Sequence, residues 1–117
     1  MKQENLVIEL TYRFALEMMS VAKTIRECSE YDLASQLWRA GTSIGANVEE
    51  AQAAQSRADF KSKMSIAAKE ARETRYWLRL TKEANILSAK MVDPLLEKID
   101  QILRVLTSIV KSTSENP

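Results

Sequence analysis

The sequence predicts an all-α protein: an up-down-up-down four-helix bundle formed by a single domain over residues 1–117, assembled into a homo-oligomer. Gly and Pro occur only twice each, which leaves few turns and is typical of long helices rather than of a β fold. Apolar residues recur with a period of about 3.6 in four successive segments, the pattern of amphipathic helices. The breaks between these segments are short, so neighbouring helices are expected to run antiparallel.

The first helix is predicted over about residues 5–30 and the second over about 32–55. Asp32 is the expected N-cap of the second helix, because its carboxylate can accept a hydrogen bond from a free N–H group of the first turn. The apolar stripe of each helix is expected to face the core. The stripe comprises Leu6, Leu10, Phe14, Val21, Ile25 and Cys28 in the first helix, with Val7 and Met18 at its edge, and Leu33, Leu37, Ala40, Ile44, Val48 and Ala51 in the second.

The third helix is predicted over about residues 56–84 and the fourth over about 88–112, followed by a frayed polar tail at 113–117. Ser56 and Asp59 form an expected capping box, in which the Ser oxygen accepts a backbone N–H and Asp59 reaches back. The fourth helix starts either with Ser88 as its cap or with Asp93, followed by Pro94 at the tolerated first position. The core faces are Phe60, Met64, Ala67, Ala71 and Leu78 in the third helix, and Leu95, Leu96, Ile99, Ile102, Leu103, Leu106 and Val110 in the fourth.

The first and third helices each carry a second apolar strip. When residues are placed at about 100° per step, this strip lies on a different side of the helix axis from the first. A helix of a monomeric bundle needs one stripe, and a large apolar patch is unusual on a soluble monomer. We therefore predict that the second strips pack against other subunits. The alternative is that Tyr12 and Trp77 only cover helix edges, as scattered apolar residues often do. The predicted interface residues are Tyr12, Leu16, Met19, Ile66, Trp77 and Leu80.

Gly41 and Gly45 lie four residues apart on one side of the second helix. Each Gly costs a helix about 1 kcal/mol relative to Ala, a cost that is tolerated where another backbone or a large side chain comes close. We expect either a helix contact at a subunit boundary or room for Trp38 or Trp77.

A line of polar residues flanks the core stripe of the second helix, and Glu70 lies between the two apolar strips of the third. Partly buried polar groups need partners, because an unsatisfied one costs roughly 1–3 kcal/mol. We expect Arg39 and Asn47 to contact Glu70 or its neighbours across the helix pair. Because Arg39 would keep the carboxylates ionised, the set is interpreted as a structural network rather than a catalytic site. Its members are Arg39, Ser43, Asn47, Glu50 and Glu70.

The residue types present exclude several kinds of site. The chain has no His and one Cys, Cys28, so neither an internal disulfide nor a Cys/His zinc site can form. Cys28 is expected to be a small core residue rather than a nucleophile. No segment has the pattern of a signal peptide or a membrane span. We therefore predict a cytoplasmic protein that is not an enzyme, has no catalytic residue, metal or cofactor, and binds neither a membrane nor a small-molecule substrate.

Positive charge is concentrated in the third helix. Residues 61–87 contain seven basic and three acidic side chains, a net charge of +4, although the whole chain carries only +1. A basic helical stripe that includes an aromatic residue, here Tyr76, is suited to binding the phosphate backbone of nucleic acid. The alternative is a solvated face that pairs with acidic residues such as Glu49, Glu73 and Glu83. The predicted nucleic-acid-binding residues are Lys61, Lys69, Arg72, Arg75, Arg79 and Lys82.

Residues 36–78 present many specific residue types in a fixed order, and this segment resembles the signature of the 23S rRNA intervening-sequence protein family. These small bacterial proteins are related to the accessory proteins of diversity-generating retroelements. Ala51 departs from the pattern, because the family usually has Gly there. The matching positions are Leu37, Arg39, Ala40, Ser43, Ile44, Asn47, Glu50, Ser56, Phe60, Lys63, Ala67, Glu70, Ala71, Glu73, Thr74, Tyr76, Trp77 and Leu78.

The resemblance implies an up-down bundle that assembles as a ring, commonly a homopentamer. The retroelement relatives bind nucleic acid and a reverse transcriptase through a strongly basic surface, from which this chain departs by its near-neutral charge. We predict a non-enzymatic accessory protein that binds RNA, or a complex containing nucleic acid, through the basic stripe of the third helix. The alternative is a protein–protein scaffold that docks a partner enzyme and uses its basic residues in subunit contacts.

Overall fold

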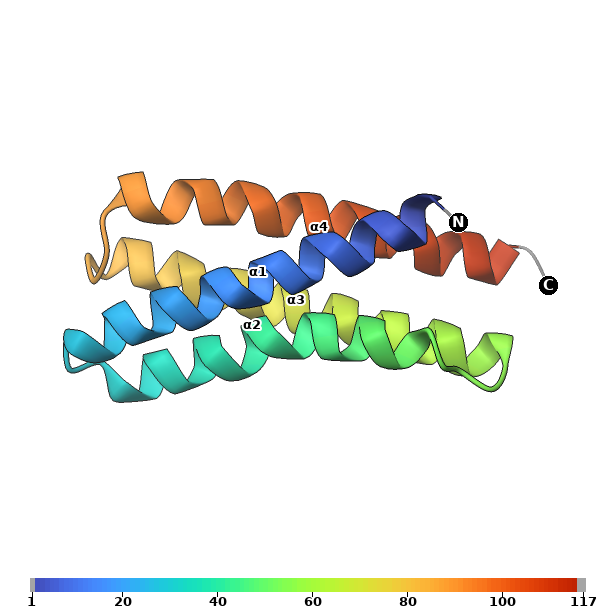
Figure 1. The fold of residues 1–117 in the computed structure, drawn as a ribbon. Helices are drawn as coiled ribbons and strands as arrows, with labels where there is room; N and C mark the ends of the chain where they lie inside the picture. The colour runs from blue at the N-terminus through green and yellow to red at the C-terminus, as the bar shows by residue number, and fades with distance from the viewer. Residues whose placement is uncertain (1, 116–117) are drawn as a thin grey trace.

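The computed structural model describes residues 2–115, which form four long α-helices and no strand. The helices are α1 (Lys2–Glu27), α2 (Tyr31–Ala51), α3 (Arg57–Glu83) and α4 (Ala89–Glu115). They run alternately up and down, so that α1 begins and α4 ends at the same end of the bundle (Figure 1). Each helix packs against its neighbours in sequence, and α4 also contacts α1, whereas the backbones of the diagonal pairs lie further apart within this part of the chain. The predicted all-α fold with four helices is confirmed.

All four helices contribute to one core. Phe14 of α1, Leu37 of α2, Met64 of α3 and Ile99 of α4 are fully buried together. The predicted core faces of α2, α3 and α4 lie against this core, with Leu33, Phe60, Leu96, Leu103 and Val110 half-buried at its margin. None of the helices described here combines the length and apolar character needed to cross a bilayer.

The core face of α1 is rotated from the predicted stripe. Val7 and Met18, which were expected at the edge of the stripe, are fully buried, whereas Leu6 is 45% exposed. The buried line also includes Thr11, whose hydroxyl donates to the Val7 carbonyl at 2.7 Å and so leaves no unsatisfied polar group. The prediction failed because α1 has apolar residues on several sides, and the choice among them depends on where α2 packs.

The turn between α1 and α2 corrects the prediction for Cys28. α1 ends at Glu27 because Ser29 adopts φ 65° and the Glu30 N–H donates to the Ile25 carbonyl at 3.3 Å. A left-handed residue followed by a backbone hydrogen bond to a carbonyl of the last helical turn is a common way to end a helix, and the left-handed residue is most often Gly. Cys28 therefore lies in the turn and is exposed, so its assignment to the core was wrong.

The capping predictions for α2 were also wrong. α2 begins at Tyr31, and its N-cap Glu30 makes no side-chain capping bond, so Asp32 lies inside the first turn instead of capping it. There its carboxylate still suits the positive end of the helix dipole. α2 ends at Ala51, short of the predicted residue 55, because a turn follows before the cap of α3.

Local caps define the starts of α3 and α4. Ser56 Oγ accepts from the Asp59 N–H at 3.0 Å, as expected for a capping box. Asp59 reaches back to the Gln55 N–H at 3.3 Å, one residue earlier than the standard arrangement. The two options for α4 are resolved in favour of Ser88, whose Oγ accepts from the Met91 N–H at 3.3 Å, and Pro94 lies within the helix.

The ends of α3 and α4 differ from the prediction in opposite directions. α3 ends at Glu83, and Asn85 turns the chain with φ 59°; Asn tolerates this left-handed region better than most residues. α4 continues to Glu115, so residues 113–115 of the predicted frayed tail are helical. Residues 116 and 117 of that tail lie outside the described residues.

The two glycines bring α1 and α2 of the same chain together. A Cβ added to Gly41 would lie 2.5 Å from Cγ of Met18, and one added to Gly45 would lie 3.2 Å from the Thr11 carbonyl oxygen. The close approach was therefore predicted correctly but with the wrong partner. Neither tryptophan fills the space, because α1 occupies it.

Candidate nucleic-acid interface

A polar cluster connects α2 to α3. Arg39 Nη1 of α2 donates to Glu70 Oε1 at 3.1 Å, and its Nη2 donates to Glu73 Oε2. Glu73 also accepts from the indole Nε1 of Trp77 at 3.0 Å. Arg39 additionally donates to the side-chain oxygen of Gln36 on its own helix. The cluster thus includes Arg39 and Glu70 from the predicted network and adds Glu73, Trp77 and Gln36.

The other members of the predicted network bond elsewhere. Asn47 Nδ2 donates to the Ser43 carbonyl at 2.9 Å, and Ser43 Oγ donates to the Arg39 carbonyl at 2.6 Å, both within α2. Asn47 therefore does not meet Glu70, because the helix's own carbonyls lie closer to its amide. Glu50 faces Lys63 of α3 at 3.7 Å. Residues 2–115 contain no group of His, Cys, Asp or Glu arranged to hold a metal ion.

The basic stripe of α3 is divided into two parts. Towards the C-terminal end of α3, Arg75 pairs with Asp100 at 2.8 Å and Lys82 pairs with Asp93 at 2.7 Å, both across to α4. Arg79 lies 4.0 Å from Glu83 on its own helix. The charge of this part is balanced by acidic neighbours. Among the acidic partners anticipated from the sequence, Glu83 takes this role, whereas Glu73 belongs to the cluster around Arg39.

The other part of the stripe carries unbalanced positive charge. Lys61, Lys69 and Arg72 are exposed and form no ion pair with any residue that the structure describes. Next to them, α3 and α4 enclose a shallow groove of about 240 Å³, which we call the α3/α4 groove. Its lining residues are Ser65, Ala68, Arg72, Thr107, Val110 and Lys111. Two cations and two hydroxyl groups, contributed by two helices, therefore surround one groove.

Two basic residues of α4 were not predicted. Lys111 lines the α3/α4 groove, and Arg104 is exposed two turns earlier on the same helix. Within residues 2–115 neither forms an ion pair. The spacing of seven residues places both on one face of α4, but the sequence alone does not show that this face adjoins α3.

Comparison with known proteins places the chain in a family. The family model for the 23S rRNA-intervening sequence protein matches residues 3–108, nearly the whole chain. The chain belongs to this family. The resemblance seen in the sequence is thereby confirmed.

A solved structure supports the same relationship. It is a crystal structure from Bacteroides thetaiotaomicron of a protein with unknown function from the S23 ribosomal protein family. The two chains are 38% identical and superpose with a TM-score of 0.90, over 93% of this chain and 98% of the other. A search of curated proteins gives no match.

The positions that carry the family resemblance mainly build the bundle. Leu37, Ile44 and Leu78 are fully buried, and Arg39 and Glu70 form the ion pair between α2 and α3. By contrast, the unpaired cations at the α3/α4 groove lie outside the matching positions. The family signature therefore accounts for the fold of this member, whereas the evidence for the basic surface is the geometry of this chain alone.

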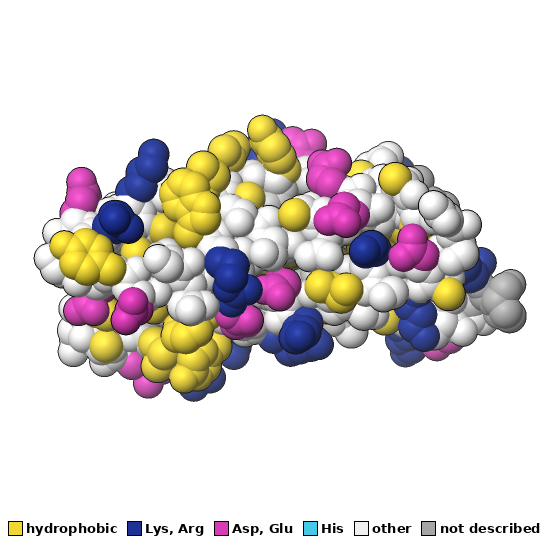
Figure 2. All heavy atoms as spheres, turned by 90° about the horizontal axis from the view of Figure 1, so that it is seen from below, with side chains coloured by type: hydrophobic (Ala, Val, Ile, Leu, Met, Phe, Trp, Pro, Cys, Tyr) yellow, Lys and Arg dark blue, Asp and Glu magenta, His cyan; other side chains and the backbone are white. Residues whose placement is uncertain are grey.

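The predicted oligomer-interface residues differ in exposure. Tyr12 is 61% exposed and Leu16 53% exposed on α1, and Ile66 and Leu80 are also exposed on α3. Met19 and Trp77 are half-buried, and Trp77 packs against the core as well as bonding Glu73. The space-filling view shows hydrophobic side chains gathered at several places along one face, between basic and acidic ones (Figure 2). Trp77 thus has a role within the chain, and the exposed members remain free to contact another molecule.

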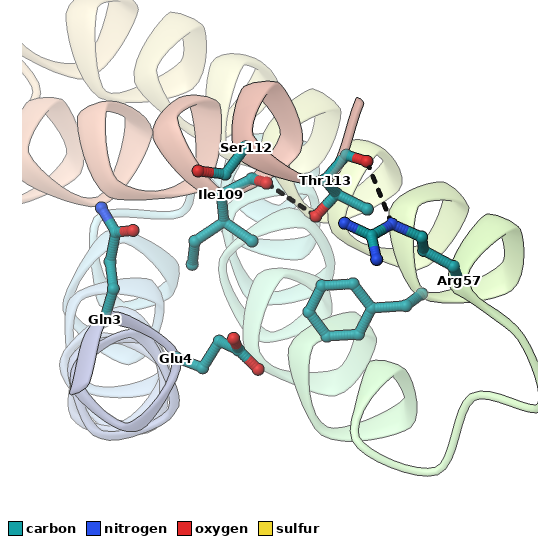
Figure 3. A pocket seen from close by; sticks show the side chains of 7 residues that line it. Gln3, Glu4, Arg57, Ile109, Ser112 and Thr113 are labelled. Atoms are coloured by element: carbon teal, nitrogen blue, oxygen red, sulfur yellow. Dashed lines mark hydrogen bonds between the residues drawn. The ribbon is translucent and has the colours of Figure 1, made fainter. Parts of the chain in front are cut away.

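The termini of α1, α3 and α4 surround a hollow of about 340 Å³ at one end of the bundle (Figure 3). Arg57 Nε donates to the Thr113 carbonyl at 3.3 Å, in the last turn of α4. The last carbonyls of a helix lack intrahelical partners and attract positive charge. Gln3, which lines the hollow, donates from Nε2 to Ser108 Oγ of α4 at 2.9 Å. These contacts tie the helix ends together, so we assign Arg57 a structural role.

Proposed function

We propose that this protein is a non-enzymatic, homo-oligomeric accessory protein that acts in the cytoplasm and binds RNA through the α3/α4 surface. We define this surface by five exposed basic residues, Lys61, Lys69, Arg72, Arg104 and Lys111. The observation that carries the proposal is that none of the five is neutralised by an acidic partner among residues 2–115. Cations that are already paired must lose a partner before binding a phosphate, whereas these need not.

RNA fits this surface better than a small anion does. The basic side chains extend along two adjoining helices, which suits a ligand with regularly repeated phosphates. Ser65 and Thr107 line the groove between the helices and offer hydroxyl groups for further phosphate contacts. The net charge of the chain is only +1, so binding depends on this local concentration of charge rather than on a general attraction. Assembly would add the fields of several copies.

Self-association is the second component of the proposal. Exposed Tyr12 and Leu16 on α1, and Ile66 and Leu80 on α3, give apolar surface on the two helices that flank α2. Burying such side chains removes apolar area from water, at roughly 25 cal/mol per Å². Two separate apolar regions on one chain allow each copy to contact two neighbours, as a closed ring requires. We propose a homopentamer, the assembly that the family resemblance implies.

A protein–protein scaffold is the second candidate function. The same exposed apolar side chains, Tyr12 and Leu16 above all, favour it, since a partner enzyme could use them as anchors. The two candidates differ in the dominant force, because phosphate binding releases counterions from the nucleic acid, whereas apolar docking does not.

Salt dependence separates these candidates. A fluorescently labelled RNA hairpin is titrated with the protein at several salt concentrations, and the dissociation constant is read from anisotropy. If three phosphates are neutralised in each protomer, the logarithm of the association constant K, the reciprocal of the dissociation constant, is expected to fall with log[salt] with a slope of roughly −2 to −3 for each bound protomer. Absence of RNA binding at low salt would contradict the proposal and favour the scaffold.

A further inference from the structure

A second groove lies on the opposite side of the bundle, between α1 and α2. We call it the α1/α2 groove, and its volume is about 440 Å³. It is lined by Ala22, Lys23 and Arg26 from α1 and by Ala34, Ser35 and Trp38 from α2. It is separate from the α3/α4 groove, because the two grooves lie between different helix pairs and share no lining residue. Its size is within the range of ligand pockets, roughly 300–1,000 Å³.

Trp38 presents an indole ring without a partner in the core. The side chain is 40% exposed, in contrast to the half-buried Trp77. Beside it, the helix pair presents two alanines, Ala22 and Ala34, which are buried at the base of the groove. Because a methyl group fills little space, the groove next to the indole stays open to a flat ligand. An exposed Trp beside small residues is a suitable platform for stacking an aromatic base.

Two cations stand on the α1 side of the same groove. Lys23 and Arg26 are exposed, and neither forms an ion pair within residues 2–115. The Arg26 guanidinium lies 5.4 Å from the centre of the Tyr31 ring, a cation–π contact that holds it at the α1/α2 turn. The groove therefore combines an open aromatic surface with two cations that lack a counter-charge, of which one is held in place.

We propose that the α1/α2 groove binds a nucleotide, with the base stacked on Trp38 and the phosphate group between Lys23 and Arg26. Each half of such a ligand matches one half of the groove. The α3/α4 groove has cations but no aromatic lining residue. The groove beside Tyr12 has an aromatic residue, but its charged lining residue is Glu49, which would repel a phosphate. A second copy of this chain fits less well, because it would have to neutralise Lys23 and Arg26.

Fluorescence of Trp38 tests the proposal directly. The variant Trp77→Phe leaves Trp38 as the one indole, because the chain has two Trp residues. This variant is titrated with ATP, and in parallel with adenosine and with inorganic triphosphate. ATP is expected to change the fluorescence saturably. Adenosine and triphosphate should each bind at least about tenfold more weakly, since each lacks one half of the interaction.

Charge variants then locate the phosphate. Lys23→Gln with Arg26→Gln in the Trp77→Phe background should weaken ATP binding by about tenfold or more. The matched control is Arg13→Gln with Lys90→Gln, which removes the same net charge from exposed positions outside the groove and should leave the titration unchanged. Calorimetry with Trp38→Ala gives a readout independent of fluorescence, and a loss of at least about tenfold is expected.

Three results would overturn the proposal: no saturable response to ATP, equal affinity in the Lys23/Arg26 variant and its control, or unchanged affinity in Trp38→Ala. A different outcome is that the parent does not bind ATP and the Lys23/Arg26 variant has a lower assembled mass. The groove would then be a contact between copies of the chain. Because ATP is a single nucleotide, whereas the α3/α4 surface is proposed to bind the backbone phosphates of successive nucleotides, failure of RNA binding would not decide this experiment.

Discussion

Gly41 determines how closely α1 and α2 can approach. Its missing side chain leaves room for Met18, whose Cγ and Cβ would lie 2.5 and 2.6 Å from an added Cβ. These atoms belong to the inner part of the Met18 side chain, so a rotation of its flexible end cannot relieve the contact. The helices themselves would have to separate. A Gly inside a helix, which usually weakens it, is therefore favourable at this position.

Gly41→Ala tests this contact. We expect the free energy of unfolding to fall by about 1 kcal/mol. Overpacking costs roughly 1–3 kcal/mol, whereas the higher helix propensity of Ala stabilises the helix by only about 1 kcal/mol. Urea denaturation followed by circular dichroism measures the change. Ala46 is exposed on the same helix, and Ala46→Gly should lower stability by about 1 kcal/mol through propensity alone. A more stable Gly41→Ala variant would show that α1 and α2 can separate at no cost.

Single residues also explain where the sequence pattern and the structure differ. Ser29 and Asn85 adopt left-handed conformations without being Gly, so the usual signal for a helix end is missing at both turns. The spacing of Cys28 continues the apolar stripe of α1 and so predicts a core position, but the helix ends one residue earlier. Such errors concern the last turn of a helix, where local hydrogen bonds override the periodicity.

At the scale of the elements, α2 and α3 are joined by the ion pairs of Arg39 with Glu70 and Glu73. The Glu70 side chain is only 15% exposed, so its carboxylate depends on Arg39 more than a surface carboxylate would. Weakening one partner of a partly buried ion pair is costly, because the other charge is then left without full compensation. We therefore expect the cluster to fix the position of α3 against α2.

Glu70→Gln tests the role of this cluster. We expect the free energy of unfolding to fall by about 1 kcal/mol, because a charge-assisted bond is replaced by a weaker neutral one. Thermal denaturation at neutral pH measures it. Glu83→Gln makes the same change on the same helix at an exposed site, 4.0 Å from Arg79, and should shift stability by less than about 0.5 kcal/mol. Equal effects of both variants would argue against a special role for Glu70.

The helices themselves could be predicted, because each has a long periodic apolar stripe and few breaks. The candidate site could be predicted only in part. The spacing of basic residues located the stripe on α3, but the partners of Arg75 and Lys82 are Asp100 and Asp93 on α4. Arg104 and Lys111 complete the surface from the same helix. Contacts between helices decide which charges are free, and a helical wheel of one segment cannot show them.

At the scale of the whole molecule, the bundle presents different chemistry on different sides. The α3/α4 surface is basic, and α1 and α3 carry exposed apolar residues on the sides that flank α2. A monomer gains nothing from keeping such residues in water. We therefore predict that the apolar sides are covered by other copies while the basic surface stays open to solvent.

Leu16→Glu and Leu80→Glu test the assembly. Each places a charge on an exposed apolar position, and each should lower the mass measured by light scattering while leaving the helical content unchanged. These positions are better suited than Trp77, which also packs against the core. Met91→Glu, at a similarly exposed position on α4, is the control and should keep the parent mass. A monomeric parent protein would refute self-association altogether.

RNA affinity of paired charge variants tests whether the α3/α4 surface binds RNA. Arg72→Gln with Lys111→Gln removes two groove cations, and Arg13→Gln with Lys90→Gln removes the same net charge elsewhere on the exposed surface. We predict that the groove variant binds a labelled RNA hairpin much more weakly, with the slope of log K, where K is the association constant, against log[salt] reduced in magnitude by about 2, while the control retains the parent affinity and slope. Equal RNA binding by the two variants would contradict the assignment of the α3/α4 surface.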